Sequence, residues 1–261
     1  MSQLSKHIKE TMSKRIAVCF HGIHGGIGKG KMYDATNFNL GINNSSIKVL
    51  ETAHKYYSKN IESYNDIDIF FHSWDVDLEE RLVELYKPKD YQVETQKKFD
   101  IPSYVGSNSR GYTEQRGQAH YSRWYSLFKS NDLKKEYERK NNFKYDLVMQ
   151  SRFDLCWLDK IVFEEEFNPD FFYTSTPIVS GKKELPDRWF VSDSNKMDKL
   201  SEMYDLINDF CNPKSKLGIS QYLGISSHFM VCNFLRNHLN YNVKYKFKYR
   251  DKHLMVRDLN E

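Results

Sequence analysis

Charged side chains follow apolar runs at three points of the chain, in positions suited to binding an anion or taking up a proton. His21-Gly22 ends one apolar run, Arg152-Phe-Asp154 ends another, and Asp187 follows a loop that contains a proline. A charge placed beside a buried strand is costly unless it is paired or binds something. These segments therefore contain the candidate functional residues.

The segment Arg152-Phe-Asp154 suits the binding of a nucleotide diphosphate. A carboxylate such as that of Asp154 can hold Mg²⁺ or Mn²⁺, which prefer oxygen ligands, and the metal can bridge the diphosphate. The Arg152 guanidinium can itself offset the charge of a diphosphate. The competing interpretation is an internal Arg152–Asp154 ion pair that only fixes the turn.

Asp187 is the best candidate for a general base, and Glu184 in the same loop is the second. A carboxylate that takes up a proton during a reaction is worth about 10²–10⁴-fold in rate. In the competing interpretation Asp187 pairs with Arg188 or caps a turn. Trp189 can stack on a sugar ring, although a large aromatic side chain lies more often in the core.

The loop 22–30 holds five of the twelve glycines and follows the first predicted strand. Small residues let backbone N–H groups approach an anion, which favours a ligand-binding role over that of a surface loop. The loop departs from a P-loop, because Gly30 stands where Ser or Thr should follow the lysine, and it departs from the dinucleotide pattern at Lys31. A P-loop-like kinase or sulfotransferase is therefore a minor alternative.

The rest of the chain alternates between buried-strand and helical patterns. Strands are expected at 15–21, 68–74, 145–155 and 171–175, with helices at 45–60, 77–86, 118–140, 194–211 and 220–239. This alternation predicts an α/β protein: a single-domain, Rossmann-like, three-layer α/β/α arrangement with a mainly parallel sheet and an antiparallel edge strand.

Three further expectations follow from this pattern. The run 243–249, in which aromatic residues alternate with lysines, should be an edge strand, and Asp77 should cap the helix that runs through Tyr86. Residues 1–14 should be a flexible segment before a domain at 15–261. Because ligands bind beyond the carboxyl ends of parallel strands, His21, Arg152 and Asp187 should meet at one rim.

The composition excludes several classes of function. Thirty-nine Lys+Arg against 35 Asp+Glu leave a net charge of only +4, which is too small for a nucleic-acid footprint. No apolar stretch reaches the roughly 18 residues of a membrane span, and the polar N-terminus does not resemble a signal peptide. The four cysteines are scattered without metal-ligand spacing. We therefore expect a soluble, cytoplasmic protein, and its oligomeric state stays open.

Several segments, taken in order, resemble a family of viral and bacterial proteins related to GT-A glycosyltransferases. The resemblance covers roughly residues 15–240 and rests on the stretch 121–155, which ends in Tyr-Asp-Leu-Val-Met-Gln-Ser-Arg-Phe-Asp-Leu, and on three short motifs. These motifs are the strand ending Phe20-His21-Gly22, the strand Phe71-His72-Ser73-Trp74, and Asp187-Arg188-Trp189-Phe190 before Met197-Asp198.

The resemblance implies a GT-A-type fold and a transferase that moves a sugar from a nucleotide-diphosphate donor to a hydroxyl of a glycan acceptor. Arg152-Phe-Asp154 would take the place of the metal-binding Asp-x-Asp, so that Asp154 would hold Mn²⁺ or Mg²⁺ although an arginine replaces the first acid. A catalytically degenerate binding protein of the same fold is the alternative. The implied donor-binding residues are His21, Gly22, Arg123, Arg152 and Asp154, and the implied acceptor-binding residues are Arg188 and Trp189.

Overall fold

A computed structural model describes residues 14–24, 44–105, 114–177, 184–218 and 226–259. Its main sheet has seven strands in the order β3-β2-β1-β4-β7-β6-β8, and two short strands, β5 and β9, form a second sheet. The strands are β1 (Ile16–Gly22), β2 (Ile67–Ser73), β3 (Asp90–Val93), β4 (Leu147–Arg152), β5 (Leu155–Trp157), β6 (Phe172–Thr176), β7 (Trp189–Ser192), β8 (Val243–Lys248) and β9 (His253–Met255).

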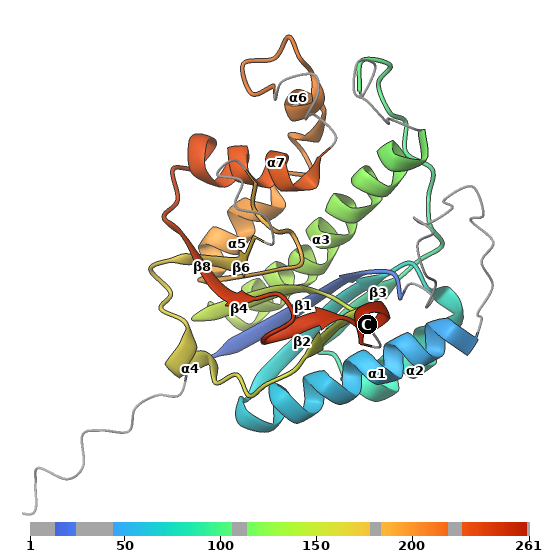
Figure 1. Ribbon diagram of the computed structural model, residues 1–261, viewed down its shortest axis with the longest axis vertical. Helices are drawn as coiled ribbons and strands as arrows, with labels where there is room; N and C mark the ends of the chain where they lie inside the picture. The colour runs from blue at the N-terminus through green and yellow to red at the C-terminus, as the bar shows by residue number, and fades with distance from the viewer. Residues whose placement is uncertain (1–13, 25–43, 106–113, 178–183, 219–225, 260–261) are drawn as a thin grey trace, which may run out of the picture.

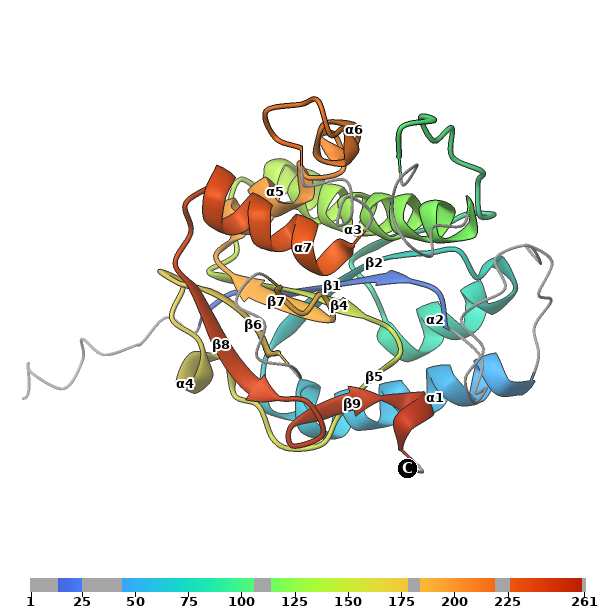
Figure 2. The same ribbon diagram turned by 45° about the horizontal axis from the view of Figure 1, so that its top comes forward.

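Helices cover both faces of the main sheet (Figures 1 and 2). One face carries α1 (Asn44–Asn60) and α2 (Glu79–Tyr86). The other carries the long α3 (Glu114–Asn141) together with α5 (Ser194–Ser201) and α7 (Ser227–Cys232), which continues into the π-helical turn η4 (Asn233–His238). The remaining helical segments are α4 (Phe163–Glu166), α6 (Ile207–Cys211), η2 (Glu62–Tyr64), η3 (Val76–Leu78) and η5 (Val256–Asp258).

The predicted α/β class with a mainly parallel sheet is confirmed. The alternation of side chains along β1 explains the two helical layers, because Ala17 and Cys19 pack under α3 whereas Val18 and Phe20 pack toward α1 and α2. The four cysteines are free and buried. No helix in the described ranges is long and apolar enough to cross a membrane.

The antiparallel strand lies elsewhere than expected. Within the described residues, β7 is antiparallel to both its neighbours, β4 and β6, and lies inside the sheet. The lysine-rich run does form the edge strand β8, but it is parallel to β6. β8 therefore runs opposite to β7 and in the same direction as β6. The short link from β6 to β7 permits an antiparallel return.

Several predicted elements differ in extent. Asp77 does not cap α2, because it lies inside η3 and α2 begins after Leu78 without a side-chain cap. The predicted strand 145–155 turns at 153–154 into β5, and the predicted helix 194–211 is interrupted between α5 and α6. β7 was not predicted. Apart from Lys14, the proposed flexible segment 1–14 lies outside the described residues.

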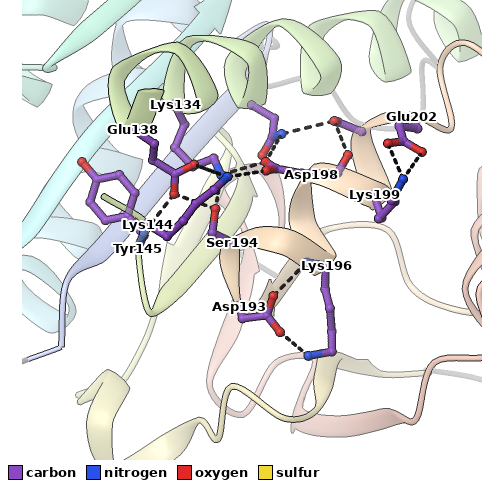
Figure 3. Close-up of polar contacts among 12 residues, drawn as sticks. Lys134, Glu138, Lys144, Tyr145, Asp193, Ser194, Lys196, Asp198, Lys199 and Glu202 are labelled. Atoms are coloured by element: carbon purple, nitrogen blue, oxygen red, sulfur yellow. Dashed lines mark hydrogen bonds and ion pairs between the residues drawn. The ribbon is translucent and has the colours of Figure 1, made fainter. Parts of the chain in front are cut away.

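A buried polar network holds α3 against α5 (Figure 3). The Lys134 ammonium is fully buried and binds three groups: the carboxylates of Glu138 and Asp198, at 3.0 and 2.8 Å, and the Ser194 hydroxyl. Glu138 also accepts the Tyr145 N–H at 2.9 Å, so the network reaches the approach to β4. The Met197-Asp198 motif therefore serves packing rather than ligand binding.

Removing the Lys134 charge should destabilise the fold. Lys134→Ala leaves the buried Glu138 and the partly buried Asp198 with only Lys144, which is half exposed, as a shared cation. Breaking a buried ion pair from one side costs about 3–5 kcal/mol, and Lys144 should keep the loss near the lower end of that range. Urea unfolding followed by circular dichroism should report this loss. Arg139→Ala, which removes an exposed ion pair with Glu136 on the same helix, is the matched control and should change stability little. Equal stability of Lys134→Ala and the parent would contradict the interpretation.

Candidate functional site at the carboxyl ends of β1 and β4

The carboxyl ends of β1 and β4 lie at the point where the strand order of the sheet reverses. The chain leaves β1 for β2 on one side, and β4 occupies the other side. Open α/β sheets bind ligands in the crevice at such a switch point. The register pairs His21 with Arg152, so these two side chains emerge next to each other on the face covered by α3.

His21 is the most unusual group at this rim. The residue is only 2% exposed, and its Nε2 atom has no hydrogen-bond partner in the part of the chain that the structure describes. Burial, followed by the positive charges of Arg123 and Arg152, lowers the pKa of His21 well below its ordinary value. The ring is therefore neutral, with one nitrogen free to bond a ligand. A buried polar atom left unpaired costs about 1–3 kcal/mol, which a ligand could recover.

Gly22 continues the rim with a backbone that favours glycine. Its φ is +107°, and its N–H donates to the Ser126 hydroxyl of α3 at 2.8 Å. Among the described residues, no atom lies within 4 Å of where a Cβ would stand. The strand-end histidine His72 differs from His21, because its two ring nitrogens bond Ser126 and Glu94. Residues 25–30 of the glycine loop lie outside the described residues.

Arg152 and Asp154 form a two-pronged ion pair. The Arg152 Nε and Nη2 atoms donate to the two carboxylate oxygens of Asp154 at 2.8 and 2.6 Å. Asp154 is buried, whereas the Arg152 side chain is 25% exposed. The internal ion pair considered from the sequence is therefore present.

The described residues do not fit a Mn²⁺ or Mg²⁺ site at Asp154. Both oxygens of this carboxylate are already taken by Arg152. Within the described ranges, no three His, Cys, Asp or Glu side chains gather in a way that could hold a metal ion. Arg152 stands where an Asp-x-Asp pair has its first acidic residue, and its positive charge repels a metal cation.

Asp187 is held by two elements at once. One carboxylate oxygen accepts from Nη1 of Arg123 on α3 at 3.0 Å, and the other bonds Nε2 of His228 on α7 at 2.9 Å. The Asp187 carbonyl also accepts from Arg123. Burial alone would raise the pKa of Asp187, but Arg123 and then His228 outweigh it and hold the pKa well below its usual range. Asp187 is therefore an anion with both oxygens in use.

The structure brings the three rim residues together. Arg152 is the register partner of His21, and the charges of Arg123, Arg152 and Asp187 all influence the pKa of His21, so these residues lie in one neighbourhood. Arg123, predicted to bind the donor, is here the buried partner of Asp187, with its Nε unpaired. The Arg152 N–H donates to the carbonyl of Arg188 at 3.3 Å, which ties β4 to the segment entering β7.

The remaining predicted residues lie around this cluster. The Arg188 guanidinium stacks over the Tyr249 ring at 4.1 Å, and its Nε has no partner. Glu184 is half-buried and lies close enough to Cys232 of α7 to act on the pKa of that thiol. Trp189 is 0% exposed and packs on Trp157, so the prediction that it stacks on a sugar ring is wrong. The competing core assignment is correct, because β7 is buried throughout.

Sequence reasoning missed two partners of this cluster. His228 bonds Asp187, and the buried His120 bonds the Ser227 hydroxyl through Nδ1 at 3.0 Å. Burial lowers the pKa of His120 to about 4, and its Nε2 is unpaired. His228 lies 41 positions from Asp187, and no spacing rule connects two such residues. The sequence offered only the histidine itself, inside the predicted helix 220–239.

No protein-family model matches the chain, and no curated protein matches it in sequence. Among solved structures, a candidate nucleotide-diphospho-sugar transferase from Desulfovibrio desulfuricans G20 is 10% identical, with a TM-score of 0.43 over 94% of this chain and 83% of that one. The apo-form glycosyltransferase GlyE of Streptococcus pneumoniae TIGR4 is 11% identical, with a TM-score of 0.43 over 89% of this chain and 45% of that one. This chain thus matches less than half of GlyE. At this sequence identity and TM-score, the similarity does not identify catalytic or binding residues.

The Arg123–Asp187 pair predicts a pH-dependent stability difference. Asp187→Asn leaves the buried Arg123 without its carboxylate, at a cost of about 3 kcal/mol at pH 7. The folded pKa of Asp187 lies below the unfolded value of about 3.9, so its contribution is complete at neutral pH and is lost as pH falls through that value toward the folded pKa.

Urea titrations at pH 7 and pH 3 test this expectation. The gap in unfolding free energy between the parent and Asp187→Asn should narrow by about 1 kcal/mol at pH 3. Asp209→Asn, at an exposed position of α6, is the control and should show no such trend. A gap of the same size at both pH values would rule out an ionised Asp187 as the source of the stability.

Proposed function

We propose that the chain is a glycosyltransferase that moves a sugar from a nucleotide-diphosphate donor to a hydroxyl of a glycan acceptor. The observation that carries the proposal is the group of side chains at the switch point between β1 and β4. There a buried imidazole with a nitrogen that has no partner among the described residues, that of His21, adjoins the guanidinium of Arg152, whose side chain is 25% exposed. The order of motifs along the chain supports the same assignment.

The charge of the cluster favours a diphosphate. Three arginines, Arg123, Arg152 and Arg188, stand against two carboxylates, Asp154 and Asp187, and the nearby histidines His21 and His120 have lowered pKa values. The arginines outnumber these two carboxylates, and Asp258 also acts on Arg188. Guanidinium groups in a partly buried region attract an anion, and arginine is well suited to phosphate oxygens because its fork donates two parallel hydrogen bonds.

In this proposal the donor lies across the strand ends. The diphosphate contacts Arg152, and the nucleoside approaches His21 and Gly22. As the bond between sugar and diphosphate breaks, negative charge grows on the leaving group, and Arg152 stabilises that charge without reorganisation. Asp154 orients the Arg152 fork. Metal assistance from Mn²⁺ or Mg²⁺ would need further ligands, so no step is assigned to a metal.

The acceptor side is assigned to the segment 184–188. Asp187 faces α3 and α7 at one end of the cluster, and Arg188, with its unpaired Nε, lies at the other. Glu184 remains the second candidate for a base. A sugar hydroxyl that enters between these residues would meet the donor near Arg152. Trp189 has no part in this arrangement, because it is enclosed by the core.

One observation favours a second function. The Arg152–Asp154 pair occupies the position where the resembling family carries a metal-binding acidic pair. A fold that has lost this chemistry can still bind a nucleotide or a glycan as a non-catalytic module. Turnover separates the two functions: a transferase releases nucleoside diphosphate from a sugar nucleotide when an acceptor is present, whereas a binding module does not.

Titration calorimetry with UDP and GDP, with and without Mn²⁺, tests donor binding. We expect the parent to bind one of them and Arg152→Ala to bind it about 10–100-fold more weakly, since a hydrogen bond to a charged group contributes about 1.5–3 kcal/mol. Asp154→Ala should retain binding without Mn²⁺. Arg139→Ala, on the exposed surface of α3, is the charge-matched control. An absence of binding by the parent, or unchanged binding by Arg152→Ala, would contradict the proposal.

A further inference from the structure

The state of Asp187 limits what it can do as a base. Its two carboxylate oxygens are occupied by Arg123 and His228, and the Arg123 guanidinium lies 3.0 Å from one of them. A proton arriving at this carboxylate would have to displace a buried cation. A group so stabilised as an anion is a weak proton acceptor, because general-base catalysis works best when the pKa of the base lies near the operating pH.

His228 differs from Asp187 in its hydrogen bonding and in its exposure to solvent. Its Nε2 atom lies 2.9 Å from a carboxylate oxygen of Asp187, and an ionised carboxylate only accepts hydrogen bonds. Nε2 must therefore carry a hydrogen, and the neutral ring keeps a lone pair on Nδ1. The His228 side chain is 42% exposed, so part of the ring faces solvent and a substrate can reach it.

The backbone segment that carries His228 is held at two further points. The Leu185 N–H donates to the carbonyl of His228 at 3.1 Å, which joins the loop before Asp187 to the first turn of α7. The neighbouring Ser227 hydroxyl bonds Nδ1 of His120 on α3 at 3.0 Å. Arg123 and His120 lie one turn apart on α3, so this helix supports both the carboxylate and the turn that carries His228.

We propose that His228 is the general base of the transfer reaction, with Asp187 as the residue that positions it. This inference rests on the proposed function. Nδ1 of His228 takes the proton of the acceptor hydroxyl while the hydroxyl oxygen forms a bond to the anomeric carbon. The bond from that carbon to the diphosphate oxygen breaks, and its electron pair leaves with the nucleoside diphosphate. The Asp187 carboxylate stabilises the imidazolium, as the carboxylate of a Ser-His-Asp triad does.

The first test reads the tautomer and needs no substrate. Nitrogen-15 NMR of the parent protein, with His228 assigned by its loss in His228→Gln, should show hydrogen on Nε2 and an unprotonated Nδ1 in the neutral ring. Asp187→Asn should shift this signal, because the carboxylate that selects the tautomer is gone. A ring with hydrogen on Nδ1 in the parent would overturn the inference.

The second test measures turnover with UDP-glucose, UDP-galactose and GDP-mannose, using simple glycans as acceptors. His228→Gln keeps an N–H donor for Asp187 but has no basic nitrogen. It should bind UDP or GDP within about twofold of the parent and lose about 10²–10⁴-fold in turnover. Free imidazole should restore part of the activity of His228→Gly. The control is His238→Gln, an exposed histidine at the end of η4, which should leave turnover unchanged.

The outcomes separate the two proposals. Turnover by His228→Gln within threefold of the parent overturns the role of His228 and leaves the transferase assignment intact. Nucleotide binding without any turnover by the parent supports the binding module and overturns the inference. A parent that binds no nucleoside diphosphate overturns the proposed function, and the inference fails with it.

Discussion

The buried ion pair between Arg123 and Asp187 is the contact on which the arrangement of the site depends. It joins the central sheet to the helical layer that covers one face, because Arg123 belongs to α3 and Asp187 lies two residues before β7. Two charges removed from water are costly, and they persist only where each has a good partner. Here each end has more than one contact, since Arg123 also bonds the Asp187 carbonyl and His228 bonds the carboxylate.

This pair helps to link two regions of the site, the strand ends of β1 and β4 and the first turn of α7. On one side the parallel register of β1 and β4 sets His21 beside Arg152, where Asp154 orients the guanidinium. On the other side α7 presents His228 to Asp187. The carbonyl of Arg188, bonded by the amide of Arg152, connects the two regions through the backbone. A donor anion at Arg152 and a proton acceptor at His228 would therefore share one rigid frame.

Residues that end continuous apolar runs could be predicted from the sequence. His21, Gly22 and Arg152 could be predicted because a buried parallel strand is uniformly apolar and its carboxyl end is where polarity returns. β7 was missed because Trp189-Phe-Val-Ser192 is a four-residue run that directly follows two charged residues. Because this short strand was not recognised, Trp189 was wrongly predicted to bind an acceptor.

Contacts between distant segments could not be predicted in this way. The pairing of Asp187 with His228 depends on how α7 folds back over α3, and the pairing of Lys134 with Asp198 depends on the packing of α5. Local patterns carry no information on either. Asp77 illustrates a related limit: its spacing suits a helix cap, but a preceding 3₁₀ turn moves the helix start beyond it.

The most direct test of the central claim is a crystal structure of the chain with UDP or GDP bound. The account predicts a diphosphate within hydrogen-bonding distance of the Arg152 guanidinium, and a nucleoside that reaches the unpaired Nε2 of His21. A nucleotide found on another face of the molecule, with His21 and Arg152 untouched, would contradict it.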